Sequence, residues 1–268
     1  MRLTVIGAGN LASSLAPAIV RAGHTVVQVY SRTRRSADAL ASAVGASAVT
    51  DLRDVGNSAE VYVLAVSDDA IVTLLPVLCA GKDDKVFIHT AGSVPMSVFG
   101  GFARHCGVLY PMQTFSKSRT VDMRHVPLFI EASDSRAEET VTAIARSLSD
   151  NVTPIDSDGR QRLHIAAVFA CNFVNHCYTL AADILAEEGL PFDILLPLID
   201  ETTRKAHVLP PLAAQTGPAA RGDNAVIDAH TAALAATPDI ENVYGALTRS
   251  IRLRHATDNN KTKPQRND

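Results

Sequence analysis

The chain has 268 residues and a formal net charge of -3 at pH 7, with 25 lysines and arginines against 28 aspartates and glutamates. Its 47% hydrophobic and 20% charged residues are ordinary for a globular protein, which excludes disordered, collagen-like and disulfide-scaffold chains. The length exceeds the common domain size of about 100–200 residues, and without a basic excess we expect no nucleic-acid partner.

The first half alternates short β-branched runs with amphipathic stretches, which is the pattern of βαβ units and a parallel sheet. The expected strands cover residues 2–6, 25–30, 60–66, 85–89, 107–110, 128–132 and 152–155. The expected helices between them cover residues 10–22, 35–44, 69–78, 96–105 and 136–148. The sequence therefore predicts an α/β domain over residues 1–156.

The second half is helical in pattern, with glycine and proline at its breaks. The expected helices cover residues 163–186, 192–208, 224–236 and 240–253. We expect an all-helical domain over residues 157–255, followed by a disordered polar tail over residues 256–268. The continuous apolar stripe of these helices offers more apolar surface than the neighbouring α/β domain needs to cover. We therefore expect a homodimer through these helices.

The cysteines and the apolar segments indicate the compartment. Four cysteines lie in apolar stretches without a CxxC pair, so we expect reduced core thiols: Cys79, Cys106, Cys171 and Cys177. They form no familiar ligand spacing with the histidines, and we expect no metal. Without an export signal before the first strand, or about 18 uncharged apolar residues in a row, we expect a cytoplasmic protein with no membrane span.

A glycine-rich loop directly follows the first strand. It reads G-x-G-x-x-A, a dinucleotide-binding fingerprint, over Gly7, Ala8, Gly9, Asn10, Leu11 and Ala12. Gly7 permits the tight turn, Gly9 lets a pyrophosphate approach the backbone, and the helix from Asn10 points unpaired N–H groups at the anion. Glycines also serve plain turns, but the strand before and the helix after favour a nucleotide site.

The second strand ends without the aspartate or glutamate that holds a free ribose 2′-hydroxyl. In its place stand Ser31, Arg32, Thr33, Arg34 and Arg35. Arginine offers forked donors that match a 2′-phosphate, so the sequence favours NADP over NAD. The alternative is a basic helix start that faces solvent, which would oppose the helix dipole.

Small and hydroxyl residues follow the next strands of the predicted sheet, where ligands of parallel sheets bind. We expect five of them on the nicotinamide side of the cofactor: Val66, Ser67, His89, Thr90 and Ala91. The alternative is that these loops are only polar turns.

The helical half carries the candidate catalytic residues. Polar side chains on the apolar helix of residues 163–186 cost stability unless they are partnered, so they face a polar cleft or a satisfied core contact. At a 3.6-residue period His164 shares a stripe with Asn175, and Asn172 flanks it. We expect His164 to donate a proton, Asn172 and Asn175 to orient the substrate, and Arg221 to hold a substrate carboxylate. Alternatively, Asp223 caps the next helix and pairs with Arg221.

These motifs also carry a resemblance. With GAGNLA at 7–12, SRT at 31–33, LAVSDDAI at 64–71 and HTAGS at 89–93, the first 155 or so residues resemble the NADP-binding domains of pyrroline-5-carboxylate reductases and deazaflavin-dependent NADP reductases. With YPMQTFS, HIAAVFACNFVNH and TGPAARGD, the whole chain resembles a bacterial family of Rossmann-like NADP oxidoreductases with a helical C-terminal domain of unknown function. The resemblance implies pyrophosphate binding at 7–11, 2′-phosphate binding at 31–33, and nicotinamide contacts at 66–67 and 89–91.

One departure bears on the reaction. Related β-hydroxyacid dehydrogenases carry a lysine on the first long helix after the nucleotide domain, and this chain has none between residues 159 and 186. An iminium substrate arrives protonated and needs no strong side-chain acid. We therefore expect NADPH-dependent reduction of a C=N or C=O bond of a small polar metabolite at the interdomain cleft. The alternatives are a non-catalytic NADP(H)-binding sensor or regulatory protein, and a deazaflavin cofactor as the second substrate.

Overall fold

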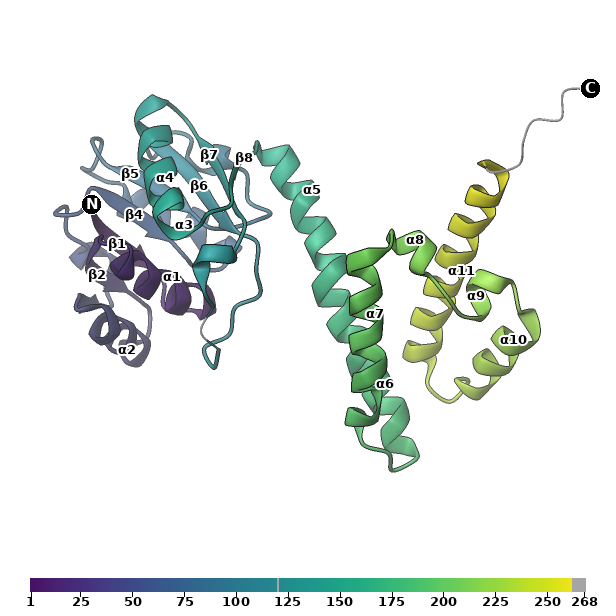
Figure 1. Ribbon diagram of the computed structural model, residues 1–268. Coiled ribbons are helices and arrows are strands. Elements are labelled where there is room, and N and C mark those ends of the chain that lie inside the picture. The colour runs from purple at the N-terminus through teal and green to yellow at the C-terminus, as the bar shows by residue number, and fades with distance from the viewer. Residues whose placement is uncertain (120, 262–268) are drawn as a thin grey trace, which may run out of the picture. The chain divides into compact units, whose positions relative to one another are not determined.

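The computed structural model of the chain describes residues 1–119 and 121–261, the side chains of 258–261 excepted. The chain divides into two compact units, one ending at Asn172 and the other beginning at Phe173 (Figure 1). The division falls inside a helical segment, and the expected border of a functional domain at residue 157 stays a prediction.

The first unit is built on one eight-stranded sheet with the order β3-β2-β1-β4-β5-β6-β7-β8. The strands are β1 (Arg2–Ile6), β2 (Thr25–Tyr30), β3 (Ser47–Val49), β4 (Val61–Leu64), β5 (Val86–His89), β6 (His105–Pro111), β7 (Leu128–Ala132) and β8 (Val152–Pro154). Neighbours pair in parallel except β6 and β7, which are antiparallel. The strand order reverses between β1 and β4, which is where open parallel sheets bind ligands. The predicted α/β architecture is confirmed.

Two sequence-based details are wrong. The three-residue β3 escaped prediction because it is too short to show a period. The expected helix over residues 96–105 is only a 3₁₀ turn, η2 (Met96–Phe99). Gly100 and Gly101 follow it, Gly101 with φ +80°, and two glycines cost a helix too much backbone entropy.

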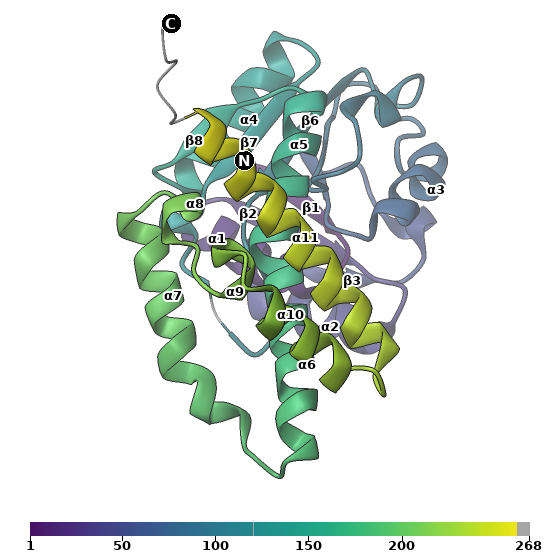
Figure 2. The same cartoon turned by 90° about the vertical axis from the view of Figure 1, so that its right-hand side faces the viewer.

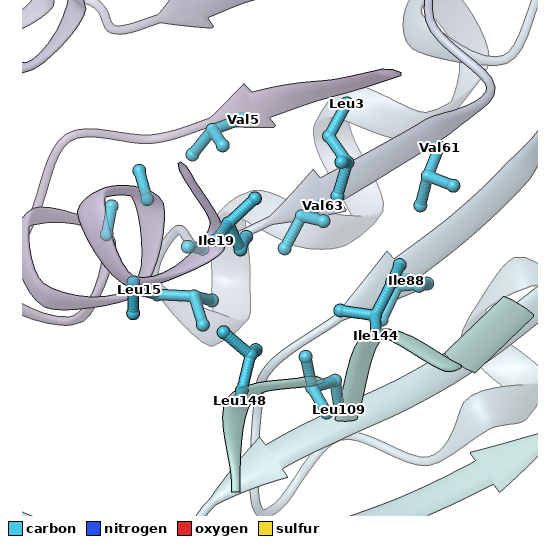
Figure 3. Packing of buried hydrophobic residues seen from close by; sticks show 14 of the residues in the cluster. Leu3, Val5, Leu15, Ile19, Val61, Val63, Ile88, Leu109, Ile144 and Leu148 are labelled. Carbon is cyan, nitrogen blue, oxygen red and sulfur yellow. The ribbon is translucent and has the colours of Figure 1, made fainter. Parts of the chain in front are cut away.

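Helices cover both faces of the sheet. They are α1 (Asn10–Arg21), α2 (Arg34–Val44) and α4 (Ser135–Leu148) on one face, with α3 (Asp68–Leu78) and η2 on the other. Figure 3 shows Leu15 and Ile19 of α1 beside Val5 and Val63 of the strands. The central strands are buried along their length, as parallel strands with helices on both faces must be.

A long helical segment, Ser157–Glu187, follows the sheet. It comprises α5 (Ser157–Ala167), a π-helical stretch η4 (Val168–Phe173) and α6 (Val174–Glu187). A π turn closes with an i→i+5 bond and holds more residues than an α turn, so it ends the 3.6-residue period. The π-helical stretch thus interrupts the 3.6-residue spacing on which the expected stripe of His164 and Asn175 was based, and the roles of both residues stay predictions.

The same segment bears on the expectation of no membrane span, which stays a prediction. By length and by a mean hydropathy of 1.3 over 18 residues, it is the one helix among the described residues that meets the criterion for a membrane span. A single such helix is a weak indication, and this one carries Asn172, Asn175 and His176, polar residues that are expensive inside a bilayer.

The second unit is all-helical, as predicted. After α6 come η5 (Phe192–Leu195), α7 (Leu196–Val208), α8 (Pro211–Ala214), α9 (Pro218–Arg221), α10 (Asn224–Ala233) and α11 (Pro238–Lys261). The last three contact one another, and Figure 2 shows α11 alongside α9 and α10. Helix α11 continues beyond residue 256, where the polar tail was expected to begin, and residues 262–268 of that tail lie outside the described residues.

A buried ion pair fixes the start of α5 to the sheet. Arg160 is 1% exposed, and its guanidinium pairs with Glu131 of β7 and donates to the carbonyl oxygen of Val94 at 2.6 Å. The Ser157 hydroxyl donates to the same carboxylate at 2.9 Å and accepts the backbone N–H of Met96 at 3.0 Å. The first turn of α5 is thereby held to β7 and to the loop that follows β5.

Replacing Arg160 tests this anchor. Arg160→Ala leaves the Glu131 carboxylate without its charge partner, and we expect the free energy of unfolding to fall by about 3–5 kcal/mol in urea denaturation. The control is Arg124→Ala, which removes an ion pair to Asp150 whose side chains are 63% and 66% exposed. It should cost less than about 1 kcal/mol. Equal losses in the two variants would contradict the anchoring role.

Candidate functional site

Gly7 brings the loop after β1 close to the end of β4. Its φ is +114°, and its N–H donates to the carbonyl oxygen of Tyr30 at 2.8 Å. A Cβ at this position would come within 2.2 Å of the carbonyl oxygen of Ala65. Only glycine fits both the backbone conformation and the space.

Gly9, two residues on, is the N-cap of α1, and the space beside it is open. A Cβ there would meet nothing within 4 Å. No side chain caps the helix, and its first turn holds no acidic residue. The N–H groups at the start of α1 therefore face free space, and this arrangement fits an anion such as a pyrophosphate.

A cavity of about 600 Å³ lies over these glycines, at the ends of β1, β2 and β4. It brings together ten of the predicted cofactor-binding residues: Gly7, Ala8, Gly9, Asn10, Leu11, Ser31, Arg32, Thr33, Val66 and Ser67. Sequence reasoning missed the other residues that line it: Tyr30, Ser36, Ala65, Ala70, Thr73, Leu74 and Lys117. The cavity spans the point where the strand order reverses, as a dinucleotide site does.

The ribose end of the cavity is positively charged. Arg34 pairs with Asp38 at 2.8 Å, but no carboxylate in the described part of the chain pairs with Arg32 or Arg35. The first turn of α2 holds no acidic residue, and the Thr33 side chain does not cap it. Unpaired guanidinium groups beside free helix N–H groups fit a phosphate, as predicted for the 2′-phosphate of NADP.

The loop after β5 does not line this cavity. His89 is fully buried, stacks on Phe99 at 5.5 Å and accepts the N–H of Ala91 at 3.2 Å. Burial, with repulsion from Arg160, lowers the pKa of His89 to about 3, so the imidazole stays neutral. Thr90 is also buried and donates its hydroxyl to the carbonyl oxygen of Leu64 at 3.2 Å. The expected cofactor contacts of residues 89–91 stay a prediction.

His164 is held beside the ends of β5 and β6. Its Nδ1 lies 3.1 Å from the hydroxyl oxygen of Tyr110, and the two rings are edge to face. A Cβ on Gly92 would come within 2.6 Å of the same nitrogen, so the glycine makes room for the imidazole. Burial raises the pKa of Tyr110, although the charge of Arg160 acts in the opposite direction. Tyr110, which ends an apolar strand just before a proline, was not predicted as a site residue.

One hydrogen bond links the loop after β5 to the start of α3. The Ser93 hydroxyl, next to Gly92, donates to the carboxylate of Asp68 in the first turn of α3. Asp68 directly follows Ser67, which lines the cavity. The pair and the cavity therefore share the carboxyl-end edge of one sheet.

The remaining catalytic candidates lie further along the chain. Asn172 is in η4, Asn175 in α6 and Arg221 in α9. Asp223 caps α10 by accepting the N–H of Val226 at 3.3 Å, as one of the alternatives held. Arg221 pairs with no carboxylate among the residues described, so the ion pair to Asp223, which belonged to the same alternative, is not formed. The substrate roles of these residues stay predictions.

The cysteines are free but only two are core residues. Cys79 and Cys106 are buried, and burial raises the pKa of Cys79 to about 12. Cys171 and Cys177 are only half-buried, so the expectation of four core thiols is wrong for these two.

Two family models match the chain. Residues 2–92 match the model described as NADP oxidoreductase, coenzyme F420-dependent, and residues 126–251 match a domain of unknown function, DUF2520. No curated protein is significantly similar to the chain.

Solved structures resemble the chain over nearly its whole length. A protein from Bacteroides fragilis, assigned as an NADP oxidoreductase, is 50% identical, with 94% of this chain and 97% of that chain covered and a TM-score of 0.89. An imine reductase from Myxococcus stipitatus in complex with NADP⁺ is 16% identical, with 98% and 95% covered and a TM-score of 0.64. A 1-pyrroline-5-carboxylate reductase from Streptococcus pyogenes is 12% identical, with 94% and 98% covered and a TM-score of 0.62. The last two likenesses show the fold alone.

The two loop glycines give a matched test of the cofactor site. Gly9→Ala adds a methyl group to open space at an ordinary φ of -79°, so the protein should still fold, with an N-cap penalty of about 1 kcal/mol at most. The added methyl group should nevertheless raise the Kd for NADPH at least about tenfold, which is about 1.4 kcal/mol. Gly7→Ala should instead destabilise the fold itself, because its Cβ meets backbone. Fluorescence titration and thermal unfolding measure both effects; unchanged NADPH affinity in Gly9→Ala would refute the assignment.

Proposed function

The chain belongs to the family of NADP oxidoreductases, and on that premise we propose that it uses NADPH to reduce a C=N or C=O bond of a small polar metabolite. The family confirms the cofactor predicted from the missing acidic residue after β2. The reaction is proposed from one observation, the Tyr110–His164 pair, which lies at the same carboxyl-end edge of the sheet as the cofactor cavity. The expected cytoplasmic location, and a reaction between the two domains, stay predictions.

The chain's own residues account for cofactor binding. The N–H groups at the start of α1 bind the pyrophosphate, and Gly9 leaves the space that it needs. Ser31, Arg32 and Thr33 bind the 2′-phosphate, and Val66 and Ser67 lie on the nicotinamide side. When bound, NADPH supplies the hydride that adds to the substrate carbon.

His164 is the proposed proton donor. One of its ring nitrogens, Nδ1, is engaged by the Tyr110 hydroxyl, which leaves Nε2 to face the substrate. The protonated imidazole donates one N–H to the tyrosine oxygen and the other to the substrate nitrogen or oxygen, and it ends neutral. Tyr110 keeps its own proton, since burial raises its pKa, and it fixes the orientation of the ring.

The proposed substrate class follows from the side chains that can donate a proton to the substrate. The chain lacks the helix lysine of hydroxyacid dehydrogenases, so an imine, which His164 can protonate before the hydride is added, suits it best. Two structural relatives are named imine reductase and pyrroline-5-carboxylate reductase. Asn172, Asn175 and Arg221 are proposed to orient the substrate and hold its carboxylate.

Substitution of the proton donor tests the mechanism. We expect His164→Ala to lower kcat about 10²–10⁴-fold on the best substrate of a panel of cyclic imines, 2-oxo acids and coenzyme F420, with the NADPH Kd little changed. Tyr110→Phe keeps the ring that packs near Phe129 and should lose less activity. The measurement is the loss of reduced-nicotinamide absorbance.

The chain offers a matched control in unit 2. His230 also has Nδ1 3.0 Å from a tyrosine hydroxyl, that of Tyr244, and it has no part in the proposed chemistry. His230→Ala should therefore keep its turnover. An undiminished kcat in His164→Ala, or turnover of F420 alone, would overturn the proposal.

Association of two copies through the helices of unit 2 is part of the same proposal. Among the described residues from 173 to 257, only Ala219, Ile227 and Thr248 are buried. Large apolar side chains stay exposed, such as Leu198 at 64% and Leu253 at 70%. Water-exposed apolar area on this scale is typical of protein interfaces.

Light scattering tests the association. We expect twice the chain mass of 28.5 kDa for the native protein and a shift towards the single-chain mass for Leu198→Glu. Val72 of α3, 53% exposed, gives the control Val72→Glu, which should leave the mass unchanged. A native protein with the mass of one chain would contradict the dimer.

A further inference from the structure

A tight turn between β6 and β7 presents a lysine at its tip. Ser116 and Arg119 pair as an isolated antiparallel bridge, with the N–H of Arg119 3.4 Å from the carbonyl oxygen of Ser116. The hydroxyl groups of Ser116 and Ser118 lie 3.2 Å apart across the same turn. Lys117 occupies the first central position of the turn, so its side chain projects from the tip of the loop.

Packing on both sides of the turn holds this loop in place. Phe115 precedes the turn and Val121 follows it, and both are partly buried against the core cluster that α1, α2 and α4 form on their face of the sheet. The position of the tip is therefore set by apolar contacts at its base.

The tip reaches the cofactor site from a distant part of the sequence. Lys117 lines the 600 Å³ cavity together with Gly9 and Arg32. It also lines a neighbouring hollow of about 480 Å³, together with Arg35. Ala8, Ser36 and Lys117 are common to both, so the lysine lies between the glycine-rich loop and the first turn of α2.

The positive charges around the tip of the loop favour the binding of an anion. No carboxylate among the described residues pairs with Lys117, Arg32 or Arg35. Three cations without counter-charges repel one another, and they oppose the dipole of α2 at its N-terminus. An ammonium group is a compact point charge that suits a phosphate dianion, and the arginine forks add directed donors.

The two phosphate positions of the site differ in the groups that would bind them. The pyrophosphate position is served by backbone N–H groups at the start of α1. The 2′-phosphate position, at the start of α2, combines helix N–H groups with cationic side chains, and Ser36 and Arg35 beside Lys117 belong to that helix. We propose that Lys117 binds the 2′-phosphate of NADP(H) and is, with Arg32 and Arg35, a determinant of selectivity for NADPH over NADH. The proposal depends on the cofactor and is independent of the substrate.

Cofactor affinities of the full-length protein test it. Lys117→Gln should raise the Kd for NADPH about tenfold and change the Kd for NADH less than about twofold, while Lys117→Arg keeps most of the preference. Arg119→Gln on the same turn is the matched control and should leave both values unchanged. Thermal unfolding of each variant checks that the fold is intact.

Two outcomes would overturn the proposal. An unchanged NADPH affinity in Lys117→Gln would mean that the lysine does not contact the cofactor. An equal loss for NADPH and NADH would place it at the pyrophosphate, which both cofactors carry, and would remove its role in selectivity.

Discussion

The close approach of the glycine-rich loop to the end of β4 is the constraint on which the site depends. At Gly7 the chain passes so near the Ala65 carbonyl oxygen that no side chain fits. This contact lets β1 and β4 lie side by side while their following loops diverge, and the strand order reverses at that point. The cavity, the free N–H groups of α1 and the arginine cluster at α2 all follow from that divergence.

The part of the proposed site around Tyr110 and His164 depends on a buried ion pair. Arg160 and Glu131 neutralise each other where β7, α5 and the loop after β5 meet, and they place His164 one helical turn beyond the anchor. Burial, and to a smaller extent the charge of the same guanidinium, lowers the pKa of His89 and keeps that imidazole neutral, so the proposed proton donor at this edge is His164. The cofactor cavity thus depends on backbone geometry, and the Tyr110–His164 pair depends on a buried ion pair.

The features that could be predicted from the sequence are those that depend on neighbouring residues in the chain. The motif from Gly7 to Ala12 carries its own backbone requirements, and the β-branched runs fixed most strands to within two residues. What it could not predict depends on tertiary packing: the π-helical stretch inside the long helical segment, the histidine partner of Tyr110, and Lys117, which lines the cavity from a loop whose base packs against the core through Phe115 and Val121. One signal was missed, since Glu131 inside the apolar strand LFIEA indicates a buried cationic partner.

Calorimetric titration of the native protein with NADP⁺ and with NAD⁺ tests the central claim most directly. If the helix start and the cationic ribose pocket act as described, NADP⁺ binds at one site per chain, and NAD⁺ binds at least about tenfold more weakly, a difference of about 1.4 kcal/mol. Equal affinities for the two, or no saturable binding of either, would contradict the account.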